Sequence, residues 1–196
     1  MNNGYVALTF DDGPNPDSTP ALLAALAEHR ARATFFIWGA HAVRHPDHLR
    51  AVHSAGMWLG NHSQTHPYLT RADLATVLEE LSGAQQAVQT ATGTLPTLFR
   101  PPYGDTDDGI RAAAGEFGLT EVLWSVDTRD WAGVSADEIV DAASSVEPGG
   151  VILMHDGGYR STVEAVPRIL RMLDERGLKP GRIEARPDGG AVVTEP

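Results

Sequence analysis

The sequence contains no cysteine, which excludes disulfide bonds, thiolate metal ligands and cysteine nucleophiles. Basic residues are scarce as well, because 15 Lys and Arg stand against 26 Asp and Glu and give a formal net charge of −11. A protein this acidic is repelled by nucleic acid and by anionic membrane surfaces, so we expect neither as a partner. No window approaches the roughly 18 to 20 consecutive apolar residues that a membrane span requires. These absences favour a soluble protein whose partner is neutral or cationic.

The amino terminus lacks the basic and then apolar pattern of an export signal. A chain without cysteine can function on either side of a membrane, and the first expected strand begins only a few residues after Met1. We therefore expect a secreted, mature domain from which an export signal has been removed. The composition, with 42% hydrophobic residues in a chain of 196, is typical of one globular domain, and we expect residues 1–196 to form it as a monomer.

Short apolar runs alternate with helical patterns along the chain. We expect strands at 5–10, 33–37, 57–60, 97–99, 121–126 and 151–154, and helices at 21–29, 46–55, 71–92, 108–117, 135–146 and 163–176. The helix starts carry cap signals, which are Ser18 and Thr19 before Pro20, Thr70 with Asp73, and Ser135 with Glu138. Such alternation predicts parallel βα units, and their number fits a closed or nearly closed α/β barrel better than an open, doubly wound sheet.

Chemically active side chains follow the expected strands at their carboxyl ends. In chain order these are Asp11 and Asp12, His62 and His66, the segment 100–103, the segment 127–131, and His155. The loops after the strands of a βα barrel converge on one mouth, so we expect all these groups to face one cleft.

The spacing of His62 and His66 brings two imidazoles together if the backbone between them makes one helical turn. Zinc hydrolases commonly use two histidines, one carboxylate and an open position for water. One of Asp11 and Asp12 is then the expected third ligand, and the other is free to act as a general base. The alternatives are that the histidines only pack in the core or on the surface, and that Asp-Asp-Gly-Pro is an ordinary turn.

Further residues suggest a second side of the site. Arg100, beside two prolines, is suited either to orienting a carboxylate such as Asp11 or to a structural ion pair. Asp130 is suited to raising the pKa of His155 so that the imidazole acts as a general acid, although a buried structural pair is the alternative. Trp131 fits either a stacking wall for a sugar or the core. The histidines expected to lie away from the site, on the surface or in packing positions, are His29, His41, His45, His48 and His53.

Five motifs together resemble a known family. They are Thr9-Phe10-Asp11-Asp12-Gly13-Pro14, His62-Ser63-Gln64-Thr65-His66, Arg100-Pro101-Pro102-Tyr103, Asp127-Thr128-Arg129-Asp130-Trp131 and Leu153-Met154-His155. In content and order, over residues 5–178, the chain resembles the polysaccharide deacetylases of carbohydrate esterase family 4, which share the NodB-homology domain. The resemblance implies a distorted (β/α) barrel.

The resemblance also implies a divalent metal, with zinc expected and Co²⁺ or Ni²⁺ as alternatives, bound by Asp12, His62 and His66. By the same matching, Asp11 is the expected general base and Arg100 orients it. The remaining implied roles belong to Asp130, which tunes His155 as general acid, to the backbone N–H of Tyr103, which stabilises the oxyanion, and to Trp131 and Leu153, which wall the pocket for the acetyl methyl group.

The implied reaction is metal-dependent removal of acetyl groups from a polysaccharide or oligosaccharide. The motif wording is most similar to bacterial acetylxylan esterases and chitin or chitooligosaccharide deacetylases, which leaves O-acetyl and N-acetyl substrates both open. Deacetylation of peptidoglycan N-acetylglucosamine is an alternative, and a non-catalytic carbohydrate-binding domain is an alternative of another class. A non-haem iron oxygenase also uses two histidines and one carboxylate, but a spare Asp11 and an Asp130–His155 pair fit hydrolysis better.

Overall fold

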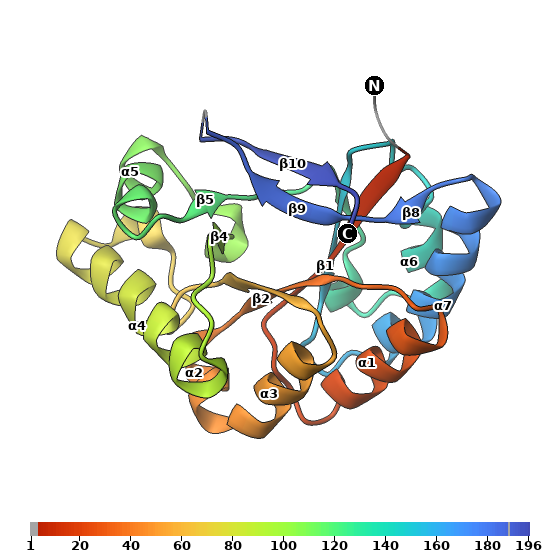
Figure 1. The fold of residues 1–196 in the computed structure, drawn as a ribbon, viewed down its shortest axis with the longest axis horizontal. Coiled ribbons are helices and arrows are strands. Elements are labelled where there is room, and N and C mark those ends of the chain that lie inside the picture. The colour runs from red at the N-terminus through yellow and green to blue at the C-terminus, as the bar shows by residue number, and fades with distance from the viewer. Residues whose placement is uncertain (1–3, 188) are drawn as a thin grey trace.

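A curled parallel sheet forms the centre of the computed structural model, which describes residues 4–187 and 189–196 (Figure 1). The strands are β1 (Tyr5–Asp11), β2 (Thr34–Ile37), β3 (Trp58–Asn61), β4 (Leu98–Phe99), β5 (Thr120–Glu121), β6 (Val126–Asp127), β7 (Val151–His155) and β8 (Lys179–Pro180). They pair in the order β5-β4-β3-β2-β1-β7-β6, and β8 pairs with the start of β1. This curled sheet confirms the predicted distorted (β/α) barrel, with β5 and β6 at its two ends.

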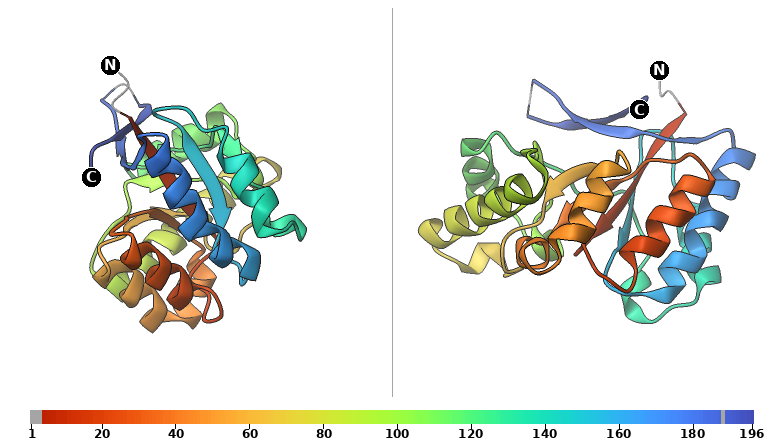
Figure 2. Two further views of the ribbon diagram at one scale, coloured as in Figure 1. Left: turned by 90° about the vertical axis from the view of Figure 1, so that its right-hand side faces the viewer. Right: turned by 60° about the horizontal axis from the view of Figure 1, so that its bottom comes forward.

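Helices cover the outside of the curl (Figure 2). They are α1 (Thr19–Glu28), α2 (Gly39–Arg44), α3 (Pro46–Ser54), α4 (Leu74–Thr92), α5 (Asp108–Glu116), α6 (Ala136–Ala143) and α7 (Arg160–Glu175), with 3-10 turns at Leu69–Arg71, Pro102–Gly104 and Asp130–Ala132. Of the helices in the described part of the chain, none is both long enough and apolar enough to cross a bilayer.

Strand β1 explains how one sheet supports two apolar cores. Its residues after Tyr5 are all buried, as expected for a central parallel strand covered on both faces. Val6, Leu8 and Phe10 face a large core shared with the outer helices, whereas Ala7 faces the inside of the curl. The sheet therefore holds the carboxyl end of β1 rigidly between packed layers.

A carboxyl-terminal hairpin, which the sequence patterns did not predict, closes the inner core. Its strands are β9 (Arg182–Ala185) and β10 (Ala191–Thr194), and they pair antiparallel. Ile183 and Val193 are buried with Ala7 and Phe36 inside the curl. Figure 1 shows the hairpin lying across the end of the molecule where β1 begins, away from the carboxyl ends of the strands.

The run expected as one strand at 121–126 is in fact two short strands. β5 ends at Glu121 and pairs with β4, whereas β6 begins at Val126 and pairs with β7, so the two lie at opposite ends of the sheet. The chain between them spans the gap in the curl. The helix α2 was also not predicted, and α7 begins at Arg160, three residues before the predicted start.

One of the predicted helix caps is confirmed and one is wrong. The capping box of Ser135 and Glu138 opens α6 as predicted. Thr70 does not cap α4, because the Asp73 side chain accepts the cap hydrogen bond and the helix begins at Leu74. The Thr70 hydroxyl instead donates to the carboxylate of Asp105, a longer-range partner that helix propensity does not reveal.

The cap predicted for α1 also differs in detail. Ser18 occupies the cap position, but its side chain makes no cap hydrogen bond. The hydroxyls of Ser18 and Thr19 both turn toward Asp156, which follows the distant strand β7.

Candidate active site

The carboxyl ends of β1, β3, β4, β6 and β7 surround a pocket of about 380 Å³. Its lining residues are Asp11, Asp12, His62, His66, Pro101, Tyr103, Trp124, Asp127, Trp131, Leu153 and His155. Arg100 and Asp130 are fully buried behind this lining. The structure thus brings the residues singled out in the sequence to one place, and it adds Trp124, which no motif had indicated.

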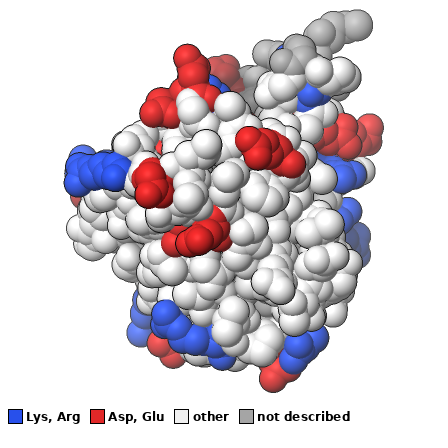
Figure 3. Space-filling model, turned by 90° about the vertical axis from the view of Figure 1, so that its left-hand side faces the viewer, with Lys and Arg blue, Asp and Glu red and all other residues white. Residues whose placement is uncertain are grey.

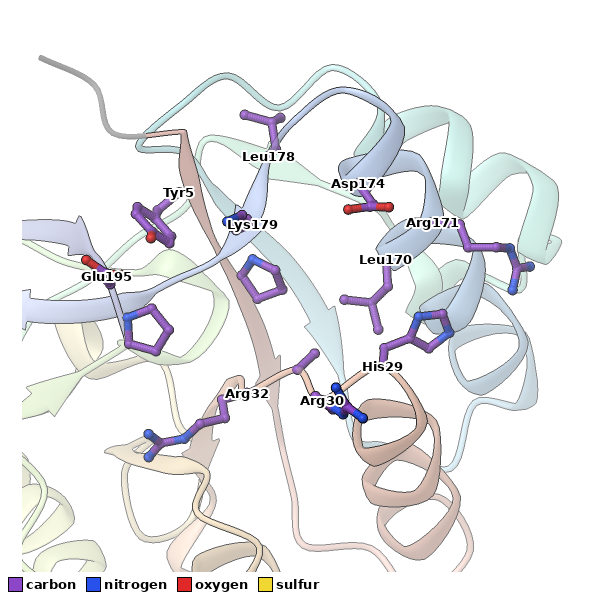
Figure 4. A pocket seen from close by; sticks show the side chains of 13 residues that line it. Tyr5, His29, Arg30, Arg32, Leu170, Arg171, Asp174, Leu178, Lys179 and Glu195 are labelled. Atoms are coloured by element: carbon purple, nitrogen blue, oxygen red, sulfur yellow. The ribbon is translucent and has the colours of Figure 1, made fainter.

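A larger hollow of about 590 Å³ lies near the start of β1 and is rich in basic side chains. Figure 4 shows Arg32 and Arg171 in this hollow pointing in opposite directions. Arg32 is already engaged, since its Nε donates to the carbonyl of Gly56. Because its basic groups do not converge on one point, we place the active site in the smaller pocket.

Three side chains in the smaller pocket have the arrangement of a metal site. The Asp12 Oδ1 atom lies 3.5 Å from His62 Nε2 and 3.3 Å from His66 Nε2. One potential ligand atom from each residue falls within 4.8 Å of the others. His62 Nδ1 lies 2.7 Å from the carbonyl oxygen of Arg100, so donation to that carbonyl leaves Nε2 free to bind a metal.

The local electrostatics fit a divalent cation at this point. Asp12 Oδ1 is buried and has no hydrogen-bond partner, which is costly unless a cation satisfies it. Burial raises the pKa of Asp12, but the two imidazoles outweigh burial and hold this pKa well below its usual range. Burial lowers the pKa of His62, but the charges of Asp11 and Asp12 raise it above its ordinary value. Asp12 thus favours its charged form, and the two carboxylates favour positive charge beside them.

The loop that carries the two imidazoles is not the helical turn that their spacing suggested. Ser63 and His66 both have left-handed backbone angles, with φ of 61° and 64°. Glu80 of α4 holds this loop, because its carboxylate accepts hydrogen bonds from the backbone N–H groups of Gln64 and Thr65 and from the Thr65 hydroxyl. Sequence reasoning missed Glu80, since nothing in a helical pattern marks one glutamate as buried.

His41 was expected away from the site, and that expectation is wrong. Its Nδ1 lies 2.7 Å from the backbone oxygen of Asp12, and its ring stacks on Trp38, which in turn contacts the ring of His66. A hydrogen bond from His41 Nδ1–H to the Asp12 carbonyl supports Asp12 in a left-handed backbone conformation, with φ of 73°. The contact depends on the unpredicted helix α2, which carries His41 toward β1.

Arg100 is fully buried and fixes the carboxylate of Asp11. One guanidinium nitrogen donates to Asp11 Oδ1 at 2.7 Å and to the Thr9 hydroxyl at 2.8 Å. Other nitrogens donate to the backbone oxygens of Val122 and Leu123, in the segment that follows β5. Asp11 Oδ2 lies 3.8 Å from His62 Nε2, beside the candidate metal ligands.

His155 pairs with Asp130 on the opposite wall. The Nδ1 atom of His155 lies 2.7 Å from Asp130 Oδ1, and Asp130 Oδ2 accepts from the backbone N–H of His155 and from the hydroxyl of Thr162. Burial lowers the pKa of His155, but the hydrogen bond to Asp130 and the nearby carboxylates outweigh burial and raise it to about 9. This raised pKa favours the protonated imidazole at neutral pH, the form that can donate a proton.

Aromatic and apolar side chains form the walls of the pocket. Trp131 and Tyr103 are 49% and 56% exposed, so their rings are accessible from solvent, while Leu153 is buried. Tyr103 has a left-handed backbone, with φ of 62°, and Tyr68 stacks on its ring at 4.1 Å between centroids. Exposed rings beside a polar pocket are typical of carbohydrate sites, where sugar faces stack on aromatics.

Comparison with known proteins agrees with this geometry. Residues 1–122 match the family described as polysaccharide deacetylase. The chain is 40% identical over 191 residues to a bifunctional xylanase/xylan deacetylase of Cellvibrio japonicus, with 97% of this chain but only 28% of that protein covered. It is 42% identical over 189 residues to a chitooligosaccharide deacetylase of a Bradyrhizobium species, with 89% of this chain and 86% of that protein covered.

A solved structure provides a close fold match. It is a family 4 carbohydrate esterase from Streptomyces lividans in complex with acetate, with 46% identity, a TM-score of 0.92 and 99% of each chain covered. Sequence, fold and the pocket at the strand ends thus lead to the same assignment. The chain belongs to the polysaccharide deacetylase family and is a deacetylase of carbohydrate esterase family 4.

Proposed function

We propose that this chain is a zinc-dependent deacetylase of neutral acetylated glycans, with chitooligosaccharides and acetylated xylan as substrates. The observation that carries the proposal is the unpartnered Asp12 Oδ1 facing the imidazoles of His62 and His66, between the Arg100–Asp11 pair and the His155–Asp130 pair. This set supplies a metal site, a base and an acid within one pocket, as hydrolysis of an acetyl group requires.

Each group has a distinct part in the reaction. Asp12, His62 and His66 would hold the zinc ion, which would supply Lewis-acid activation of water and of the acetyl carbonyl. Asp11 accepts the proton of the attacking water as the new carbon–oxygen bond forms.

The leaving group departs on the other side of the pocket. The backbone N–H of Tyr103 donates to the carbonyl oxygen as negative charge develops there. His155 then donates its proton to the departing sugar nitrogen or oxygen, which yields acetate and a free amine or hydroxyl.

The walls and the charge support the choice of substrate. Leu153 and Trp131 are suited to enclosing the acetyl methyl group, and the exposed rings of Trp131 and Tyr103 are suited to a chain of sugars. The net charge of −11 disfavours an anionic cell wall as substrate. The face shown in Figure 3 carries scattered acidic and basic groups on a largely uncharged surface.

Acetate release from acetylated chitooligosaccharides and from acetylated xylan, measured side by side, tests this proposal. We expect the zinc-loaded protein to release acetate from both, because proton transfer from His155 serves a nitrogen or an oxygen leaving group. A chelator-treated sample is the control and should release none. Release from xylan alone would define an esterase, and release from neither glycan but from peptidoglycan would overturn the substrate assignment. Binding of glycans without any release would favour a binding domain.

The pH profile of an Asp130→Asn variant tests the acid. His155 must be protonated to donate a proton. The deacetylase activity is therefore present below the raised pKa of His155 and is lost as pH rises through that value. Removing the Asp130 charge lowers this pKa, and we expect the alkaline limb of kcat/KM to move down by about 1 to 3 pH units. If the alkaline limb of the variant stays at the wild-type pH, that limb reports the titration of a group other than His155.

We further propose that residues 1–196 act as one secreted, monomeric catalytic domain without a membrane or nucleic-acid partner. The eight-stranded curled sheet and the large apolar core that packs against it support one folding unit. Light scattering should give a mass near 21.0 kDa, and a mass of twice that value would refute the monomer.

A further inference from the structure

Asp156 is a buried carboxylate to which the mechanism above assigns no part. It follows His155 directly at the end of β7, and its exposed fraction is 0%. Oδ1 accepts a hydrogen bond from the Ser18 hydroxyl at 2.5 Å, and Oδ2 accepts one from the Thr19 hydroxyl. Both donors lie at the start of α1, 138 and 137 residues away in sequence.

Each of these hydroxyls also accepts a hydrogen bond from the backbone of a loop beside the pocket. The Thr19 hydroxyl accepts from the backbone N–H of Asn15 at 2.8 Å, in the loop that follows Asp11 and Asp12. The Ser18 hydroxyl accepts from the backbone N–H of Gly158 at 3.0 Å, in the loop that follows His155. One carboxylate therefore links both loops through two relayed hydrogen bonds.

Asp156 also contacts the loop after β1 directly. Its backbone N–H donates to the carbonyl oxygen of Asp11 at 2.7 Å. At Gly13, a Cβ atom would lie only 2.5 Å from Asp156 Oδ2, so a glycine is needed for this close approach. The segment from Asp11 to Asn15 is thus hydrogen-bonded to Asp156 directly at Asp11 and through Thr19 at Asn15, and it lies closely against the Asp156 carboxylate at Gly13.

The geometry points to Asp156 as a positioning residue, which holds the base and the metal-ligand carboxylate on β1 in register with the acid on β7. It touches no reacting atom. It acts by fixing the backbone of Asp11 and Asp12 relative to His155, including the left-handed conformation that turns Asp12 toward the imidazoles. This inference rests on the proposed function for the roles of those residues.

The surroundings of Asp156 agree with a positioning role. Burial raises its pKa to about 7, against the opposing effect of the hydroxyl donors. A buried carboxylate needs hydrogen-bond donors that offset the cost of its burial, and the hydroxyls of Ser18 and Thr19 supply them. All the hydrogen bonds named above lead to the two loops of the pocket.

An Asp156→Asn variant keeps the shape of the side chain but replaces one acceptor oxygen with a donor. Since a misplacement of about 1 Å can cost about 10²-fold in rate, we expect kcat to fall by about tenfold or more. KM should stay within about twofold, because the walls of the pocket are untouched. Zinc affinity, measured by competition with a chelating indicator, should fall by about tenfold, since the Asp12 loop is less firmly held.

A matched pair of threonine variants provides the control. Thr19→Val breaks the relay from Asn15 to Asp156 and should lower kcat and zinc affinity in the same direction. Thr34→Val removes an equally buried hydroxyl that has no hydrogen-bond partner, so both quantities should stay at the wild-type level. In a double-mutant cycle, the effects of Asp156→Asn and Thr19→Val on kcat and on zinc affinity should be less than additive, because both changes break the same hydrogen-bond network.

Wild-type kcat and wild-type zinc affinity in Asp156→Asn, at a temperature where it is folded, would overturn the inference. If that variant fails to fold, Thr19→Val decides, and its equality with Thr34→Val in both measurements would overturn the inference equally. The zinc measurement also separates this inference from the proposed function, because it needs no substrate. A wild-type protein that releases no acetate would refute the function and leave the Asp156 comparison standing.

Discussion

Replacing Asp11 with Asn is expected to lower kcat by about 10² to 10⁴-fold, the range typical of a lost general base. The change preserves the shape of the side chain, and Arg100 can still donate to the remaining oxygen, so the fold should be retained. An amide cannot accept the proton of the attacking water. Acetate release at saturating substrate measures the effect, and KM should change little because Asp11 acts in the transition state.

Zinc binding separates a base from a ligand in this variant. Asp12, His62 and His66 form the candidate metal site without Asp11, so Asp11→Asn should bind zinc as the wild type does. Asp174→Asn makes the same chemical change on an exposed carboxylate in the other hollow and should leave kcat unaltered. Wild-type turnover in Asp11→Asn would refute its role as base, and loss of zinc would instead make Asp11 a ligand.

The fold could be predicted from the sequence wherever a segment is both apolar and regular. The runs that became β1 and β7 are buried on both faces, so their composition alone indicates parallel strands. The hairpin of β9 and β10 escaped prediction because its strands are short and mostly not buried, with Ile183 and Val193 as the buried contacts. Such strands are defined by what they cover, which only the folded chain shows.

The candidate site could be predicted as a set of strand-end residues, because the (β/α) arrangement brings strand ends together. The residues that hold the site could not be predicted in this way. Glu80, Thr162 and His41 lie within helices, and each reaches the pocket through one hydrogen bond or a few that depend on helix placement. Asp156 was next to a recognised motif, but its partners Ser18 and Thr19 carried an ordinary helix-cap signal.

Removing the metal is expected to abolish acetate release, and adding Zn²⁺ back should restore it. The base, the acid and the Arg100–Asp11 pair remain after chelation, but they lack the Lewis acid that activates both water and carbonyl. Metal binding also stabilises the folded state, by about 2.7 kcal/mol when free zinc is 100 times its Kd. The Tm of the wild type should therefore rise with added zinc, which gives a readout that requires no substrate.

A His66→Ala variant shows whether this stabilisation comes from the proposed site. His66 supplies one of the three ligand atoms, so the variant should lose both the acetate release and the zinc-dependent rise in Tm. His29→Ala removes an exposed histidine near the opposite end of the molecule and should keep both. A His66→Ala variant that retains the rise in Tm while losing activity would place the stabilising zinc elsewhere. His29→Ala leaves the pocket unchanged. If His66→Ala loses acetate release and the zinc-dependent rise in Tm while His29→Ala keeps them, zinc stabilisation and catalysis both depend on the site that contains His66.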